Sequence, residues 1–250
     1  MGLNGKKVVA IIEARMNSTR LPGKVLKPLS GVPVIGQIVN RLRAAKHVDE
    51  VCVATVNDSS CDALVDYCEE IGATVFRGSE DDVLDRVLKA AYFTDADVIV
   101  EICGDCPLID AGVVDAVVQQ YFQEGVDFCS NAIQRVHPIG LDVKVFSTAV
   151  LQQVADKTDD PYDHEHVSLY IYEHPELFSI SHLSDQLSAD QVDYRLTLDT
   201  QEDFRLINAV YQHLFDENKL FTLTDVLTLL SASPELLSIN QGIKQKGVRE

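Results

Sequence analysis

Residues 8–24 read VVAIIEARMNSTRLPGK, a short apolar run that passes directly into a polar loop. The β-branched run at 8–12 predicts a buried strand. The loop behind it is rich in Lys and Arg, although the whole chain carries a net charge of −18. From residue 14 to residue 48 the chain has seven Lys or Arg and no Asp or Glu. We therefore expect a local anion site directly after the first strand, with a solvated basic surface as the alternative.

The composition of the chain is that of a globular protein. Its 250 residues are 46% hydrophobic and 24% charged, which suits one large domain. No apolar run approaches the roughly 20 residues of a membrane helix. A secretory signal is not recognisable and the six cysteines are scattered, so we expect a reduced, cytoplasmic protein. The strong negative charge argues against nucleic acid or an anionic membrane as a partner.

Strand-like runs alternate with helical patterns in the first half of the chain. The expected strands are 8–12, 51–56, 73–78, 97–103 and 126–130, and the expected helices are 32–45, 59–70, 81–93 and 111–124. This alternation with short joins predicts an α/β fold, a mostly parallel sheet with helices on both faces. Because ligands bind at the carboxyl ends of such strands, the loops after 8–12 and 97–103 are the first candidates for a site.

The second half has a less regular pattern. It suggests strands at 139–147, 177–183 and 194–200, and helices at 148–156, 163–173 and 201–214. We expect a single domain over residues 1–238, followed by a polar and mobile tail at 239–250. Within that domain, residues 139–183 form a small β/α extension for binding a second substrate or for dimerisation. A homodimer is an option that the sequence leaves open.

The loop after the first strand has the parts of a phosphate cradle. It lacks both the GxxxxGK[ST] and the GxGxxG patterns. However, Asn17 and Ser18 are small and polar, so backbone N–H groups can approach an anion there. Positive charge for phosphate oxygens comes from the planar guanidinium groups of Arg15 and Arg20 and from the ammonium group of Lys24. We expect these three cations to contact a polyphosphate, whereas Lys27 has solvation as its alternative.

Two carboxylates follow strand-like runs elsewhere in the chain. Asp105 lies in EICGDCPLID (101–110) and Asp199 lies in RLTLDTQED (195–203). Carboxylates at strand ends suit a hard cation such as Mg²⁺. A turn-forming role for Asp105 and a helix N-cap role for Asp199 are the alternatives. Together with the cationic loop, the pair favours nucleotidyl transfer, in which a metal offsets charge on the phosphates.

Several motifs resemble one known family. ARMNSTRLPGKVLKPLSGVPVI is similar to the N-terminal signature of the cytidylyltransferases, which include the CMP-sialate and CMP-ulosonate synthetases. The strongest likeness is to the spore-coat polysaccharide (SpsF-type) branch. The motifs that follow in the order of that branch, over roughly residues 7–215, are FRGSEDDVLDR, CGDCPLID, GLDVKVF, EHV and LDTQEDF.

The resemblance implies a Rossmann-like fold of the nucleotide-diphosphosugar transferase type. It also implies a Mg²⁺-dependent reaction in which CTP and a sugar-type acceptor give an activated conjugate and pyrophosphate, for surface glycan biosynthesis. Matched residue by residue, Arg15, Lys24 and Asp105 are catalytic, while Asp105 and Asp199 hold the metal. The implied nucleotide contacts are Ala14, Arg15, Asn17, Ser18, Arg20, Lys24, Arg77 and Asp82. The implied acceptor contacts are Gly140, Asp142, His164, Glu165 and His166.

Three positions depart from the pattern of that branch. Glu13 stands where Gln is frequent, Asn17 where Gly is frequent, and Lys144 where an acidic side chain is expected. The base preference and the acceptor therefore stay open. The run DHEH (163–166) has three interpretations, namely acceptor binding, a solvated helix start, or a structural metal site. A glycosyltransferase of related fold and a non-catalytic nucleotide-binding regulator are the alternative functions.

Overall fold

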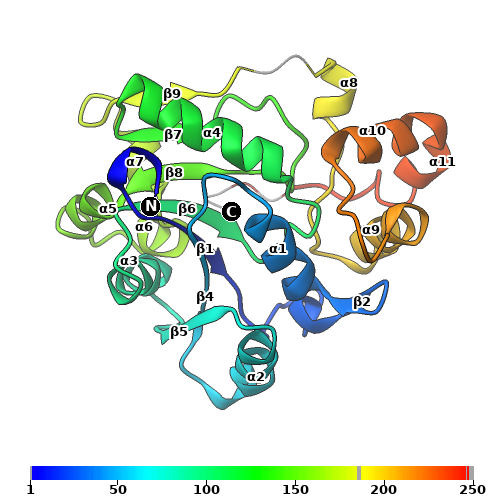
Figure 1. Ribbon diagram of the computed structural model, residues 1–250, viewed down its shortest axis with the longest axis horizontal. Coiled ribbons are helices and arrows are strands. Elements are labelled where there is room, and N and C mark those ends of the chain that lie inside the picture. Colours follow the sequence, from blue (N-terminus) through cyan, green and yellow to red (C-terminus); the bar gives the residue numbers. More distant parts are fainter. Residues whose placement is uncertain (1, 185–186, 246, 248–250) are drawn as a thin grey trace.

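The structure, a computed structural model, describes residues 2–184, 187–245 and 247. Its centre is a seven-stranded sheet with the strand order β5-β4-β1-β6-β8-β7-β9 (Figure 1). The strands are β1 (Val8–Glu13), β4 (Glu50–Val56), β5 (Thr74–Gly78), β6 (Val98–Cys103), β7 (Phe128–Ser130), β8 (Lys144–Ser147) and β9 (Ile180–His182). Only β8 runs antiparallel to its neighbours. A separate two-stranded ribbon joins β2 (Pro28–Leu29) to β3 (Val32–Pro33).

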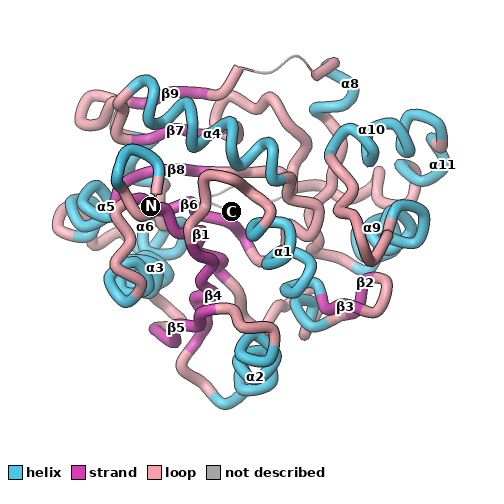
Figure 2. The backbone as a smooth tube through the Cα atoms, viewed as in Figure 1, coloured by secondary structure: helices cyan, strands magenta, loops and turns pink. Residues whose placement is uncertain are grey.

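Helices cover both faces of the sheet (Figure 2). Alternate residues of β1 lie in two different cores, with Ala10 and Ile12 on one side and Val9 and Ile11 on the other. The first core is shared with α1 (Val34–Arg43), α2 (Asp62–Glu70), α4 (Ala111–Glu124), α9 (Gln201–Leu214) and α10 (Leu223–Ala232). The second is shared with α3 (Val83–Phe93), α5 (Thr148–Ala155) and α7 (Leu169–Glu173). Because β1 is buried on both faces, it reads as a continuous apolar run.

The predicted fold class is confirmed, and the first-half strands lie where the sequence places them. The second half differs from the prediction in four segments. The expected helix 163–173 is two helices, α6 (Pro161–His166) and α7, because Val167 between them has φ 52° and ψ −70° with its side chain fully buried. The expected strand 139–147 is a strand only over 144–147, apart from an isolated bridge at Ile139, and 177–183 is a strand only over 180–182.

The prediction of a strand at 194–200 is wrong. The segment is extended but makes a single parallel bridge, between Arg195 and Ile139. The next amides of this segment bond to two different parts of the chain. Leu196 N donates to Ile139 O, and Leu198 N donates to Asp105 O. No continuous ladder forms, yet these bonds carry residue 199 to the carboxyl end of β6.

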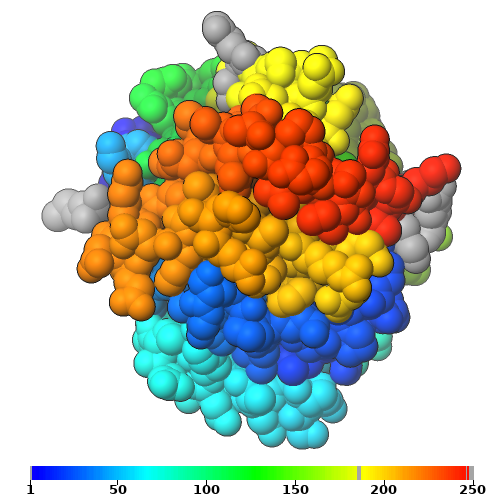
Figure 3. Space-filling model, turned by 90° about the vertical axis from the view of Figure 1, so that its right-hand side faces the viewer, coloured from blue at the N-terminus to red at the C-terminus, as the bar shows by residue number. Residues whose placement is uncertain are grey.

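The C-terminal part of the chain contains helices that the sequence analysis did not predict. Helices α10 and α11 (Pro234–Leu237) follow α9, and α8 (Ala189–Val192) precedes it. In Figure 3 this C-terminal part, coloured orange to red, lies against the blue N-terminal segment. Asn240, at the start of the expected tail, is buried. In the part of the chain that the structure describes, no helix is long and apolar enough to cross a membrane.

Gly140 allows the loop before β8 to pack against this extended segment. Its φ is +101°, and a Cβ atom there would lie 2.4 Å from the carbonyl carbon of Leu196 and 2.5 Å from the amide nitrogen of Thr197. Backbone atoms cannot give way as a flexible side chain can. We therefore predict that Gly140→Ala lowers the free energy of unfolding by about 1–3 kcal/mol, measured by urea denaturation.

The matched control is Gly242→Ala, since an added Cβ atom there meets nothing within 4 Å. Equal stability of the two variants would contradict the close packing of the Gly140 loop.

Candidate active site

The carboxyl ends of β1 and β6 open into a polar cavity of about 540 Å³. Its walls come from the first loop, the turn after β6, the segment that leads into α9, and α6. The lining side chains and backbone come from Glu13, Ala14, Arg15, Ser18, Thr19, Arg20, Lys24, Val25, Cys103, Gly104, Asp105, Tyr162, Glu165, His166, Asp199, Gln245 and Gly247. A cavity of about 640 Å³ lies at the opposite end of the sheet, but its Lys6 and Asp97 are paired with each other.

The first loop folds back on itself before it reaches the cavity. Met16 O accepts hydrogen bonds from both Ser18 N and Gly23 N. Gly23 has φ 68°, a left-handed conformation that glycine adopts at little cost, and a single 3-10 turn (Lys24–Leu26) begins directly after it. The turn directs Lys24 inward, so the loop presents its last cation to the carboxylates opposite.

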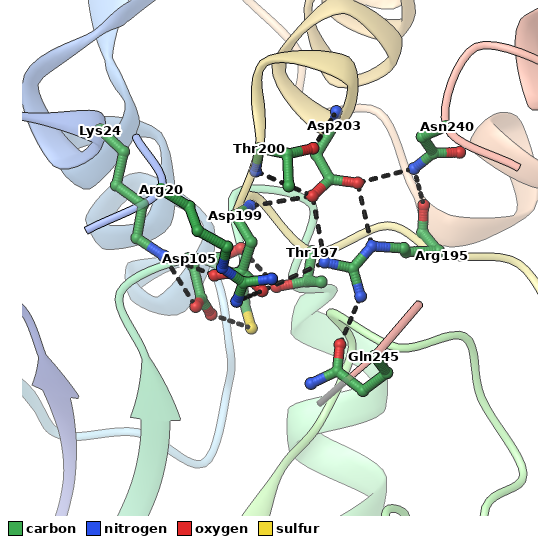
Figure 4. A network of polar contacts seen from close by, with 11 residues as sticks. Arg20, Lys24, Asp105, Arg195, Thr197, Asp199, Thr200, Asp203, Asn240 and Gln245 are labelled. Carbon is green, nitrogen blue, oxygen red and sulfur yellow. Dashed lines mark hydrogen bonds and ion pairs between the residues drawn. The ribbon is translucent and has the colours of Figure 1, made fainter. Parts of the chain in front are cut away.

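Two carboxylates share the ammonium group of Lys24 (Figure 4). Lys24 Nζ lies 3.0 Å from Asp105 Oδ2 and 2.9 Å from Asp199 Oδ1. The other oxygen of Asp199 accepts from Arg20 at 3.0 Å and from Arg195 at 3.1 Å. The structure thus brings Arg20, Lys24, Asp105 and Asp199 together from segments that lie far apart in the chain.

The charges in this cluster stabilise one another against the cost of burial. Burial alone would raise the pKa of Asp199, but the nearby charges of Lys24, Arg20 and Arg195 outweigh it and lower that pKa. Burial would likewise lower the pKa of Lys24, but the two carboxylates reverse the direction and raise it. Asp199 and Lys24 are therefore both charged at neutral pH.

A second set of buried polar groups holds Asp199 in place. Arg195 Nε lies 3.0 Å from Asp203 Oδ1, and Asp203 also accepts from the amides of Asp199 and Thr200. Asn240 donates to Asp203 at 2.9 Å and to the Arg195 carbonyl at 3.0 Å. Gln245 also accepts from Arg195. Asn240 and Gln245 belong to the segment 239–250 that was expected to be a mobile tail, and both contact residues of the site. Residues 246 and 248–250 of that segment lie outside the described residues.

Asp203 and Arg195 were missed as site residues by sequence reasoning. A signal for Asp203 was available, because Thr200 and Asp203 form a capping box at the start of α9. Thr200 is the N-cap of that helix, so Asp199 does not have the capping role that was its alternative interpretation. Nothing in the sequence near Asn240 or Gln245 indicated that they reach Arg195.

Not every predicted nucleotide contact faces the cavity. Ala14, Arg15 and Ser18 line it. Asn17 is exposed and donates to Ser60 Oγ at 3.4 Å. Arg77 pairs with Asp62 at 2.8 Å and donates to the carbonyl of Asp58. Lys27 lies over the Phe204 ring, 5.5 Å from its centroid.

Asp82 caps α3 by accepting from Asp85 N at 2.8 Å. It also lies 2.9 Å from His164 Nδ1, which ties α6 to the start of α3. The predicted nucleoside segment and the predicted acceptor helix are therefore neighbours.

The predicted acceptor residues divide into two groups. Glu165 and His166 line the cavity from α6, together with Tyr162. Gly140 serves backbone packing, and Asp142 pairs with Arg135 at 2.7 and 3.1 Å outside the cavity.

The side chains of DHEH point in different directions and do not form a metal-ligand set. Asp163 accepts from Thr158, and His164 bonds to Asp82, whereas Glu165 and His166 face the cavity. Within the described residues no group of three or more His, Cys, Asp or Glu is placed to hold a metal ion. The structural-metal interpretation of DHEH is therefore not supported by its geometry.

The two unexpected charges, Glu13 and Lys144, lie on the same face of the sheet. Lys144 on β8 is opposite Glu101 on β6, with Nζ 2.5 Å from Oε1, so the basic residue has a buried acidic partner. Burial and the Glu101 carboxylate raise the pKa of Glu13 to about 8, against weaker lowering by Lys144 and Arg86. A largely protonated Glu13 is neutral at pH 7, like the Gln frequent at this position.

The cytidylyltransferase sequence model matches residues 9–223. The chain belongs to the cytidylyltransferase family. The spore coat polysaccharide biosynthesis protein SpsF of Bacillus subtilis (strain 168) is 36% identical over 236 residues, 91% of this chain and 95% of that protein. A cytidylyltransferase structure from Leptospira borgpetersenii serovar Hardjo-bovis (strain JB197) has a TM-score of 0.88 at 32% identity, covering 96% of this chain and 100% of that chain.

A structure of CMP:2-keto-3-deoxy-manno-octonic acid synthetase complexed with CTP shares the fold, with a TM-score of 0.63 at 19% identity over 83% of this chain and 100% of that chain. The resemblance seen in the sequence motifs is thus confirmed, and this cytidylyltransferase is an enzyme of the nucleotidyltransferase class.

The raised pKa of Glu13 predicts a pH-dependent stability. Below pH 4.5, the ordinary value, the carboxyl is protonated in both the folded and the unfolded state. Between pH 4.5 and about pH 8 the unfolded chain releases the Glu13 proton while the folded protein keeps it. The free energy of unfolding therefore falls as the pH rises. The free energy of unfolding should therefore fall less between pH 5 and pH 8.5 in Glu13→Gln than in the wild type. The expected difference is about 1 kcal/mol or more, since one pKa unit is about 1.4 kcal/mol. Urea unfolding at both pH values measures this, and equal losses in the two proteins would contradict it.

The bond between His164 and Asp82 predicts a second titration. Burial would lower the pKa of His164, but hydrogen bonds to Asp82 and to the Thr158 carbonyl raise it above 6.5. The protonated form, and the stability it adds, is therefore fully present below pH 6.5 and is lost as pH rises through the folded value. Asp82→Asn still caps α3 and should lower the His164 midpoint, followed by NMR of the ring protons. Asp156→Asn is the control, and an unchanged midpoint in Asp82→Asn would refute the pairing.

Proposed function

We propose that this cytidylyltransferase activates a sugar-type acceptor (a sugar, an ulosonic acid or a phosphorylated acceptor) with CTP in a Mg²⁺-dependent reaction that releases pyrophosphate. We place it in the cytoplasm and in surface polysaccharide biosynthesis, in line with its likeness to SpsF of Bacillus subtilis. The observation that carries the proposal is the meeting of a cationic loop and two carboxylates at one cavity. The likeness of fold to a synthetase complexed with CTP supports the choice of nucleotide.

The cavity residues fit a divalent cation. An oxygen of Asp105 and an oxygen of Asp199 both lie within 3.0 Å of one nitrogen atom, so the two carboxylates converge on a single positively charged point. Carboxylate oxygens are the ligands that Mg²⁺ prefers. When bound there, the metal would act as a Lewis acid that offsets charge on the phosphate oxygens. We therefore assign Asp105 and Asp199 as its protein ligands.

The loop cations would hold the triphosphate. In the reaction an acceptor oxygen bonds to the α-phosphorus of CTP while the bond to the bridging oxygen breaks, and pyrophosphate leaves. Negative charge grows on the transferred and leaving groups. Arg15, Arg20 and Lys24 line the cavity from one side and are placed to stabilise that charge and to orient the triphosphate.

The remaining walls divide between nucleoside and acceptor. Ala14, which lines the cavity beside the neutral Glu13, would contact the nucleoside. The segment 77–82 lies outside the cavity lining and would contribute to the nucleoside site from the side of α3. Tyr162, Glu165 and His166 on α6 would contact the acceptor. His164 would hold α6 in place through Asp82.

Pyrophosphate release tests the function and the role of Asp105. Wild-type protein is assayed with each of the four nucleoside triphosphates against a panel of ulosonic acids and phosphorylated sugars, and CTP should support turnover. Asp105→Asn should lower kcat by about 10²-fold or more, because it removes one charged ligand aimed at the transition state. Its thermal unfolding should stay cooperative.

The matched control is Asp156→Asn, an exposed carboxylate at the end of α5. It should turn over like the wild type. Near-normal activity of Asp105→Asn would refute the metal assignment. No release with any pairing, beside clear hydrolysis of a nucleotide sugar, would favour a glycosyltransferase instead.

A further inference from the structure

Lys24 occupies the place at which the proposed metal ligands converge. Its ammonium nitrogen contacts Asp105 and Asp199 together, and its side chain is only 12% exposed. Asp199 is also 12% exposed and Asp105 is 25% exposed, so bulk water screens these charges weakly. The two carboxylates are thus bridged by a cation that belongs to the protein itself.

The charge balance of the cluster is complete without a metal. In the described structure, the connected ion pairs join the cations Arg20, Lys24 and Arg195 to the carboxylates Asp105, Asp199 and Asp203. Each positive charge therefore has a negative counterpart. A divalent ion that approached the pair would meet the Lys24 ammonium at close range. Like charges a few ångströms apart in a partly buried site repel one another strongly.

A nucleoside triphosphate would change this balance. Its phosphates carry about four negative charges, and the cavity that Lys24 lines is also lined by Arg15 and Arg20. Lys24 has a flexible side chain on a turn that begins at Gly23, so its ammonium can move from carboxylate to phosphate without rearranging the sheet. Once it has moved, the carboxylates are free to accept a different cation.

We propose that Lys24 acts as a surrogate cation, which keeps the Asp105–Asp199 pair closed to divalent metal until triphosphate oxygens take over its ammonium. Metal binding and nucleotide binding are then positively coupled. This inference rests on the proposed function for the identity of the nucleotide, but its main prediction concerns the nucleotide-free protein.

The test is a titration of the full chain with Mn²⁺, in which the electron paramagnetic resonance signal reports the free ion. Without nucleotide, wild-type protein should bind Mn²⁺ weakly at this site. Lys24→Met should bind Mn²⁺ about tenfold more tightly or better, in the usual range of couplings between sites. Lys24→Gln keeps a hydrogen-bond donor and loses only the charge, and should show the same gain. Lys46→Met removes an equal charge from an exposed position and should match the wild type.

The gain must be traced to the two carboxylates. Adding Asp199→Asn to Lys24→Met should abolish the tight Mn²⁺ site. In the wild type, an α,β-methylene analogue of CTP should tighten Mn²⁺ binding beyond the binding of Mn²⁺ by the analogue alone, and this coupling should be largely lost in Lys24→Met.

The proposal is overturned if wild-type protein already binds Mn²⁺ tightly at Asp105 and Asp199 without nucleotide. It is equally overturned if folded Lys24→Met and Lys24→Gln gain no affinity. Pyrophosphate release with no such gain would refute the surrogate role alone. A gain in affinity beside a lack of release with every nucleoside triphosphate would refute the proposed function and support the surrogate role.

Discussion

The bridge from Lys24 to Asp105 and Asp199 is the interaction on which the site depends. It joins Lys24, in the loop after the first strand, to Asp105 and Asp199, which lie 81 and 175 positions further along the chain. A parallel sheet makes this possible, because the ends of β1 and β6 meet at one edge. Asp199, the third residue of the bridge, does not follow a strand. It reaches that edge because the segment before α9 bonds first to Ile139 and then to Asp105.

Burying so many charges requires that each has a partner, since an unpaired buried charge is costly. Arg195 meets this need for Asp199 and Asp203 together, and Asn240 completes the hydrogen bonding of Asp203. The C-terminal segment therefore belongs to the active-site architecture. Disturbing Asn240 would leave Asp203 with fewer donors, and the effect would reach Asp199 through Arg195.

The sequence predicted the first half well because β1, β4 and β6 are almost entirely buried and its motifs are local. The cationic loop and the strand-end carboxylates were visible as residue types in definite positions. The segment 194–200 misled because its alternating apolar residues, Leu196 and Leu198, suit a strand, whereas its amides bond to two different segments. The helix break at Val167 was equally hidden, because a β-branched residue at positive φ has no sequence signal. Arg195 and Asn240 depend on long-range contacts that no local pattern records.

Glu13 and Lys144 both depart from the family pattern, and their effects are understood only when the two residues are considered together. Either charge alone, buried at the end of the sheet, would be destabilising. Glu101 and Lys144 lie opposite each other on β6 and β8, and Glu13 lies on the same face, two residues along β1 from the partner of Glu101. Lys144 compensates Glu101, and burial keeps Glu13 neutral. A neutral carboxyl can both donate and accept a hydrogen bond, as an amide can. Position 13 therefore keeps the capacity of an amide to donate and accept, as long as burial holds the proton on its carboxyl group.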